Sequence, residues 1–105
     1  MRVVAITACP TGIAHTYMAA DKLTETAKKL GITIKVETQG AMGVENRLTD
    51  QDVERADIVI LAADINIEQS DRFTKHRCLE VSIQDALQRP RRVFSQCQQL
   101  LLAHQ

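Results

Sequence analysis

The chain has 105 residues, a length that suits one domain with a single modest core. Hydrophobic residues make up 45% and charged residues 25%, an ordinary globular balance that argues against disorder. Thirteen basic residues balance thirteen acidic ones and Trp is absent, so the sequence lacks the basic, aromatic-rich character of a nucleic-acid binder. No apolar run approaches the ~18 residues that span a bilayer, and no signal peptide fits the N-terminus. We expect one cytoplasmic domain, residues 1–105, with no nucleic-acid partner and no direct membrane insertion.

The first half of the chain has the pattern strand, turn, helix, strand. Residues 2–8 form an apolar, β-branched run that is typical of a buried strand. Apolar residues at steps of three and four predict a helix over 13–30, with Gly31 as its stop. Strict alternation over 32–37 predicts a half-exposed edge strand, and the polar, glycine-containing stretch 38–46 predicts a loop.

The second half continues the alternation of helices and strands. Thr49 and Asp52 form a capping-box pattern that opens a short helix to Ala56, and residues 58–63 form a second buried strand. The remaining expected segments are a loop or irregular helix at 64–73, a weak strand at 78–81, a helix capped by Ser82 and Asp85 that breaks near Pro90, and a last helix with Val93, Phe94, Cys97, Leu100 and Leu101 on its apolar side.

This alternation predicts an α/β fold: a single-domain, doubly wound, parallel four-stranded sheet with strand order 2-1-3-4 and helices on both faces. In such sheets the working face lies beyond the carboxyl ends of the strands. The loops at Cys9, after Glu37 and at Asp64 are therefore expected to meet at one edge.

Cys9 is the main candidate for chemistry, because it lies between a buried strand and the start of a helix. The first helical N–H groups lack intrahelical partners, and the helix dipole adds positive charge there, so an anion or a thiolate is stabilised. Pro10 has no N–H to offer. The expected phosphate-binding loop is therefore formed by Thr11, Gly12, Ile13, Ala14, His15 and Thr16.

The spacing from Cys9 to His15 and Thr16 parallels the Cys-x5-Arg-Ser/Thr loop of the tyrosine phosphatases. His15 replaces the arginine, and an imidazole grips phosphate less firmly than a guanidinium. This favours a loop that accepts and releases a phosphoryl group over one that hydrolyses it. The sequence leaves open whether His15 contacts phosphate or only caps the helix, and whether Thr16 donates to the Cys9 sulfur or to the local backbone.

The other candidates are less specific. Gln39, Gly40 and Gly43 either line the pocket or present a partner surface, and Asp64 is a helix cap, a loop brace or an acid near the site. We interpret Cys78 and Cys97 as core residues. With three cysteines and no Cys-x-x-Cys spacing, neither a disulfide framework nor a metal site is expected, and no cofactor is implied.

The run from Val4 to Ala20, which contains Cys-Pro-Thr-Gly-Ile-Ala-His-Thr at 9–16, resembles the signature of the fructose-family enzyme IIB components of the bacterial phosphotransferase system. Val36-Glu37-Thr38-Gln39-Gly40 with Gly43, Glu45 and Asn46, Ile60-Leu61-Ala62-Ala63-Asp64, and Arg72-Phe73 resemble further parts of the family. The likeness covers about residues 2–73. At 74–78 the chain departs from it, because Thr-Lys-His-Arg-Cys stands where members have a Gly-Lys pair.

The resemblance implies a phosphoryl relay. A phosphohistidine on a IIA protein would pass its phosphoryl group to Cys9, and a sugar bound by the membrane IIC subunit would take it during uptake. Two alternatives compete with this reading. A small cysteine-dependent phosphatase would share the loop logic but would need an arginine at position 15, and a regulatory docking module would bind a IIA protein without forming a phosphoryl adduct.

Overall fold

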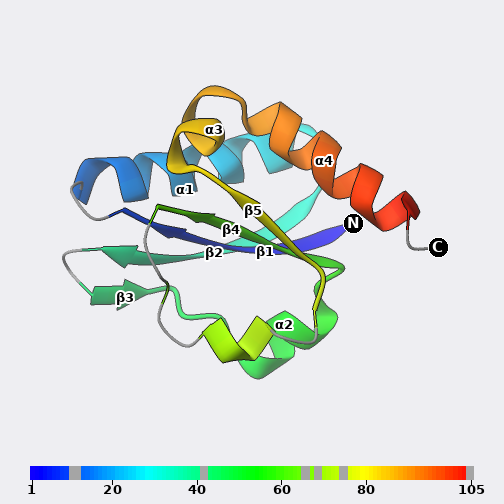
Figure 1. Cartoon of the computed structure of the whole chain (residues 1–105), viewed down its shortest axis with the longest axis horizontal. Coiled ribbons are helices and arrows are strands. Elements are labelled where there is room, and N and C mark those ends of the chain that lie inside the picture. The colour runs from blue at the N-terminus through cyan, green and yellow to red at the C-terminus, as the bar shows by residue number, and fades with distance from the viewer. Residues whose placement is uncertain (10–12, 41–42, 65–66, 68–69, 74–75, 104–105) are drawn as a thin grey trace.

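Strands and helices alternate along the chain in the computed structural model, which describes residues 1–9, 13–40, 43–64, 67, 70–73 and 76–103 (Figure 1). In chain order the elements are β1 (Arg2–Ala8), α1 (Ile13–Lys29), β2 (Thr33–Gly40), β3 (Gly43–Glu45), α2 (Asp50–Arg55), β4 (Ile58–Ala63), the 3-10 helix η1 (Ser70–Phe73), β5 (Cys78–Val81), α3 (Ile83–Gln88) and α4 (Pro90–Ala103).

The sheet has the strand order β3-β2-β1-β4-β5 in the described part of the chain. β1 pairs in parallel with β2 on one side and with β4 on the other, and β5 extends the sheet beyond β4. β3 pairs antiparallel with the end of β2. At its carboxyl end β1 places Ala8 between Gln39 and Ala63, so the carboxyl ends of three parallel strands lie side by side.

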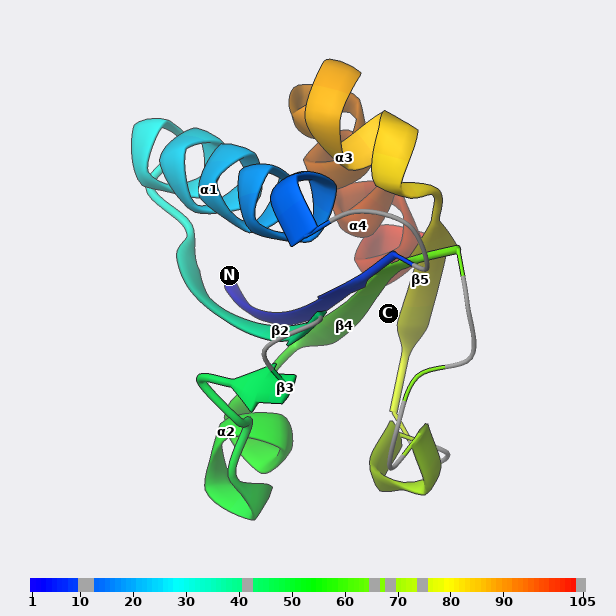
Figure 2. The same ribbon diagram turned by 90° about the vertical axis from the view of Figure 1, so that its left-hand side faces the viewer.

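Helices cover both faces of the sheet. α1, α3 and α4 lie over one face, and α2 with η1 lies under the other (Figures 1 and 2). Alternate residues of β1 enter the two cores: Val3 and Ala5 face the first layer, and Val4 and Ile6 face the second. Because β1 is covered on both faces, its apolar run is continuous, and all residues from Val3 to Ala8 are buried.

The predicted order 2-1-3-4 is confirmed, since it corresponds to β2, β1, β4 and β5, and so is the placement of helices on both faces. Two details were wrong. The sheet has a fifth strand, β3, within the stretch expected to be a loop, and β2 continues to Gly40. The cause is an antiparallel hairpin that pairs Gly40 with Gly43, whose positive φ of 89° suits glycine. β2 is therefore not the edge of the sheet where it meets β3.

The amphipathic helix after Cys9 ends one residue earlier than predicted, at Lys29. Gly31 adopts a φ of 72°, and the Ile32 N–H donates to the Ala27 carbonyl at 2.8 Å, which confirms the glycine stop. The spacing predicted that the apolar side of this helix consists of Ile13, Tyr17, Ala20, Leu23, Ala27 and Leu30. Tyr17 is only half-buried and Leu30 is 40% exposed, while the buried face consists of Thr16, Ala19, Leu23, Thr26 and Ala27.

Local capping signals fix the starts of two further helices. Thr49 accepts from the Asp52 N–H, and Asp52 accepts from the Thr49 N–H at 2.8 Å, so the capping box before α2 is confirmed. Ser82 accepts from the Asp85 N–H at 3.0 Å and caps α3, which ends before Pro90 as predicted. Within the described residues, no helix combines the length and hydropathy that crossing a membrane requires.

Candidate functional site

Cys9 follows the central strand at the carboxyl edge of the sheet. It is partly exposed and packs against the core that lies under α1, α3 and α4. Directly before it, the Ala8 carbonyl accepts a hydrogen bond from the Asp64 N–H at 3.2 Å. The end of β1 is thus tied to the end of β4, and the Cys9 sulfur stands at the edge where the strands end.

The N-terminus of α1 lies at the same edge as the end of β1 (Figure 1). The first turn of this 17-residue helix contains no acidic residue of its own, and the positive end of the helix dipole lies there. Ala14 and His15 are exposed, whereas Thr16 is buried. Two members of the expected phosphate-binding loop, Thr11 and Gly12, lie outside the described residues, and of Ile13 the structure describes the backbone.

Thr16 connects this helix to β1. Its backbone carbonyl accepts a hydrogen bond from the hydroxyl of Thr7 at 3.0 Å in a buried position. Thr7 precedes Cys9 by two residues, so both lie on the side of the strand that faces α1. The hydroxyl of Thr16 itself is buried and has no hydrogen-bond partner among the described residues. Such a group costs free energy, because burial removes the water that would otherwise satisfy it.

The candidates at the end of β2 face opposite sides of the sheet. Gly40 faces α1, and a Cβ added to it would lie 3.2 Å from the hydroxyl oxygen of Tyr17. Gln39 donates its amide to the buried Glu37 carboxylate at 2.8 Å, which lies on the face covered by η1. The structure therefore places Gly40 on the side of Cys9 and directs the amide of Gln39 away from it. Gly43 lies in β3, across the hairpin from Gly40.

Asp64 contacts the N-terminus of α3. Its carboxylate accepts from the Ile83 N–H at 3.4 Å, and its own N–H is bonded to the end of β1. The side chain thus links the end of β4 to the first turn of α3. Of the three roles that the sequence left open, these contacts correspond to the loop brace and the helix cap.

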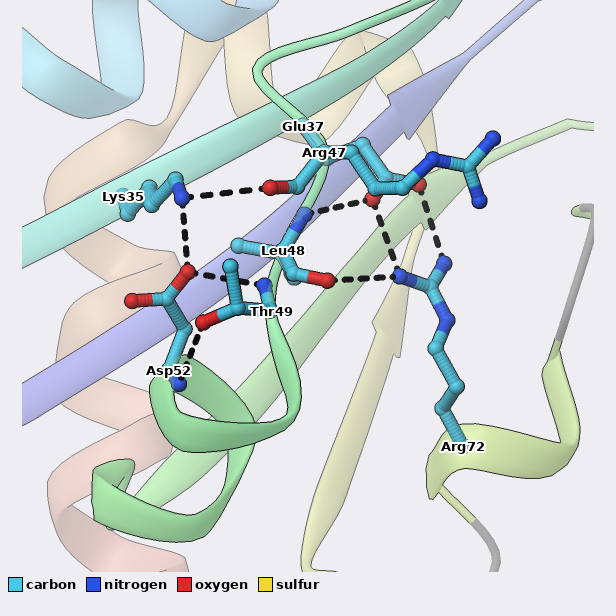
Figure 3. Close-up of polar contacts among 7 residues, drawn as sticks. All are labelled: Lys35, Glu37, Arg47, Leu48, Thr49, Asp52 and Arg72. Atoms are coloured by element: carbon cyan, nitrogen blue, oxygen red, sulfur yellow. Dashed lines mark hydrogen bonds and ion pairs between the residues drawn. The ribbon is translucent and has the colours of Figure 1, made fainter.

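The sequence reasoning missed a buried ion pair beneath this edge (Figure 3). Glu37 has no exposed side-chain surface, and both of its carboxylate oxygens are bonded to the guanidinium of Arg72 at 3.0 Å. The Leu48 N–H donates to Glu37 at 2.8 Å, and Arg72 donates back to the Leu48 carbonyl at 3.3 Å. These bonds join three parts of the chain: strand β2, the 3-10 helix η1, and the segment that precedes α2.

The charge of Glu37 is maintained by these donors. Burial alone would raise its pKa, but the hydrogen bonds from Arg72, Gln39 and the Leu48 N–H outweigh burial and hold the pKa of Glu37 below its ordinary value. A carboxylate at an alternating strand position and an arginine 35 residues later have no local spacing that signals a pair. The one signal in the sequence was that the alternation of the strand turns the charged side chain of Glu37 toward the interior.

No group of three or more His, Cys, Asp or Glu residues that would suit a metal ion occurs within the described ranges. At this edge the structure places a partly exposed cysteine before the first turn of α1. The class of protein that fold and site define is a doubly wound α/β domain with a cysteine at the carboxyl end of its central strand.

Comparison with known proteins defines that class further. Residues 4–96 match the family model described as "PTS system, Lactose/Cellobiose specific IIB subunit". The chain is 49% identical to the PTS system fructose-like EIIB component 2 of Escherichia coli K12, covering 90% of this chain and 89% of that protein. It is 48% identical to part of the PTS system fructose-specific EIIABC component of Bacillus subtilis, covering 89% of this chain and 14% of that one.

A solved structure agrees with these relatives. A domain of the fructose-specific IIABC component of Borrelia burgdorferi superposes with a TM-score of 0.86 at 44% identity, covering 90% of each chain. The chain belongs to the enzyme IIB components of the fructose and fructose-like family of the bacterial phosphoenolpyruvate-dependent sugar phosphotransferase system. Membership of this family implies phosphotransferase activity in general.

Proposed function

We propose that this chain carries a phosphoryl group on Cys9, which it accepts from the phosphohistidine of a IIA protein and passes to a sugar bound by a membrane IIC subunit. The observation that carries the proposal is the position of Cys9. It is partly exposed, it follows the central strand, and it stands before a long helix whose first turn contains no acid. A cysteine there is accessible to a donor and close to N–H groups that favour negative charge.

The transfer consists of two displacements at phosphorus. In the first, the Cys9 thiolate attacks the phosphoryl group, an S–P bond forms, and the N–P bond breaks with its electron pair left on the imidazole nitrogen. In the second, a sugar hydroxyl oxygen attacks, an O–P bond forms, the S–P electron pair returns to sulfur, and the hydroxyl proton passes to water. Both steps depend mainly on positioning and on stabilisation of charge.

The loop from Thr11 to Thr16 supplies the groups that hold the phosphoryl oxygens in this proposal. Its backbone N–H groups are the donors, because the loop leads into the positive end of α1, whose first turn contains no acidic residue. His15 is exposed in the first turn of α1. A phosphoryl group on the partly exposed Cys9 would lie at the same edge of the sheet. An imidazole there assists binding without the firm bidentate grip of an arginine, which suits a group that must leave again.

The partners follow from the names of relatives. The B. subtilis relative is named a fructose-specific EIIABC component, and a part of it is 48% identical to this chain. Its name thus lists A and C components beside the B component. This chain would contact the corresponding IIA and IIC proteins in turn. The sugar is chosen by the IIC subunit in this scheme, and the proposal does not depend on which sugar it is.

A transfer assay tests the proposal. The chain is incubated with phosphorylated IIA protein, and the modified residue is located by peptide mass mapping. We expect one phosphoryl group on Cys9, none on Cys9→Ser, and normal labelling of the control variant Cys97→Ser, whose cysteine is buried in the core. Adding membranes that contain IIC and a sugar should discharge the label to the sugar. Labelling of another residue, or steady release of phosphate from an aryl phosphate, would overturn the proposal.

A further inference from the structure

The hydroxyl of Thr16 is a buried donor for which the described part of the chain offers no acceptor. The residue has no exposed surface, so water does not replace the missing partner in the way it does for surface threonines. Threonine hydroxyls within helices usually bond to a backbone carbonyl one turn earlier. Thr24, on the same helix, does so, since its hydroxyl donates to the Ala20 carbonyl at 2.8 Å. Thr16 differs from Thr24 in that no acceptor for its hydroxyl occurs among the described residues.

The surroundings of Thr16 place it beside the end of β1. Its carbonyl accepts from the hydroxyl of Thr7, and Cys9 lies two residues further along the same side of the strand. Its methyl carbon lies 3.7 Å from the position that a Cβ at Gly40 would take, so the methyl branch faces β2. Within this buried layer, the Cys9 sulfur is the group that changes charge during the proposed reaction.

We propose that the Thr16 hydroxyl donates a hydrogen bond to the Cys9 sulfur when that sulfur is anionic, and so favours both its attack on phosphorus and its departure. The inference rests on the proposed function, in which Cys9 carries the phosphoryl group. A thiol sulfur is a weak acceptor and a thiolate is a much stronger one. The donor thus remains without a partner in the neutral state and gains one when negative charge develops on sulfur. This is differential stabilisation, which accelerates a reaction where uniform binding does not.

This assignment predicts that removing the Thr16 hydroxyl lowers the reactivity of Cys9 without lowering the stability of the fold. Thr16→Val keeps the shape of the side chain and removes an unsatisfied polar group, so the neutral-state fold should be as stable as before or more stable. The reactivity of Cys9 should fall at the same time. A residue that acted only through packing would not raise or maintain stability while it lowered the reactivity of a cysteine.

The first experiment uses the isolated chain and needs no partner. The rate at which iodoacetamide modifies Cys9 is measured from pH 5 to 10 by mass mapping of the peptide that contains it. In Thr16→Val we expect the midpoint of the rate profile to move to higher pH by roughly one unit. The reaction at neutral pH should be roughly threefold slower, because the roughly tenfold loss of thiolate is partly offset by the higher nucleophilicity of a more basic sulfur. Thr16→Ser should restore the profile. Thr26→Val, at another buried threonine of α1, is the matched control and should leave it unchanged.

The second experiment measures discharge of phosphorylated chain to sugar in the presence of IIC. Thr16→Val should slow discharge and Thr16→Ser should restore it. If Thr16→Val unfolds, the predicted gain or maintenance of stability is wrong and the proposal fails. If the variant folds and its alkylation profile matches that of the wild type, the predicted hydrogen bond to the Cys9 sulfur is wrong and the proposal fails. Failure of the proposed function is separate, because a chain that IIA does not label on Cys9 can still show the shifted alkylation profile.

Discussion

Arg72 grips both carboxylate oxygens of Glu37 with two hydrogen bonds of 3.0 Å, although 35 residues separate them in the chain. The side chain of Glu37 has no exposed surface and that of Arg72 is 14% exposed. Desolvating two charges is costly, and good geometry with additional hydrogen bonds must offset the cost. Here the Leu48 N–H and the Gln39 amide supply those further bonds. The pair therefore fixes how η1 and the segment before α2 sit against the sheet.

Removing one member of this pair should destabilise the protein strongly. Glu37→Gln leaves the Arg72 guanidinium largely buried without its counter-charge, and we expect a loss of about 3 kcal/mol in the free energy of unfolding, measured by urea denaturation. Adding Arg72→Met to that variant should cost little more, because the unpaired charge is then gone. The control is Arg89→Gln, which breaks an exposed pair with Asp85 and should cost about 0.5 kcal/mol or less. Additive losses in the double variant would contradict this account.

Stability should fall in acid through carboxylates that are ion-paired in the folded state. The hydrogen bond from Lys35, followed by that from the Thr49 N–H, lowers the pKa of Asp52 from 3.8 to about 2. A carboxyl whose folded pKa is depressed contributes stability above its unfolded pKa and loses it as the pH falls through the folded value. The contribution should therefore be constant above pH 5 and decline between about pH 4 and 2.

Urea denaturation at pH 7, 5, 3.5 and 2.5 measures this decline. Asp52→Asn removes the titrating group, so its free energy of unfolding should be lower at pH 7 and should fall less steeply between pH 5 and 2.5 than that of the wild type. Equal slopes for the two proteins would show that the Lys35–Asp52 contact of 2.6 Å does not govern acid stability.

Gly40 and Tyr17 should be energetically coupled. A Cβ at residue 40 would lie 3.2 Å from the Tyr17 hydroxyl oxygen, which itself donates to Glu45 at 3.0 Å and so ties α1 to β3. Gly40→Ala should push the tyrosine away and weaken that bond. In a Tyr17→Phe background, where the hydroxyl is absent, the same change should be better tolerated by about 0.5–1 kcal/mol. A double-mutant cycle by urea denaturation measures the coupling, and a value of zero would refute it.

The three cysteines should differ in reactivity. Burial raises the pKa of Cys97 to about 12, and burial together with the nearby charge of Glu80 raises the pKa of Cys78. Both thiols should thus remain largely protonated at pH 8, where a thiolate is the reactive form. Timed alkylation with mass mapping should therefore modify Cys97 last and only on unfolding. Modification of native Cys97 as fast as Cys9 would contradict the burial described above.

Much of the fold could be predicted because its signals are local. Buried strands are visible as apolar runs at 2–8 and 58–63. The start of α2 is marked by Thr49 and, three positions later, Asp52, which form a capping box. The pairing of β2 with β3 was missed, because the polar, glycine-containing stretch 38–46 suggests a loop, and only the pairing of residues 38–40 with 43–45 makes those residues regular.

The candidate site divides in the same way. Cys9 at a strand end and the helix after it follow from neighbouring residues, so their placement could be expected. Gln39 and Glu37 share one face because side chains alternate along a strand, but the partner of Glu37 is Arg72, 35 residues later. Such contacts between distant segments have no periodicity to read. The unpartnered hydroxyl of Thr16 is likewise visible only when the packing around it is known.

The central place of β1 also bears on how the molecule is made. Its partners are β2, some thirty residues downstream, and β4, which ends at Ala63, so the strand leading to the reactive cysteine rests on pairings far apart in sequence. Folds built on such non-local contacts form slowly, because loop-closure entropy is lost before the contacts reward it. During synthesis on the ribosome, β1 therefore has to wait for β4, which is translated after it. The edge that bears Cys9 is assembled late, although Cys9 is translated before the strands on either side of β1.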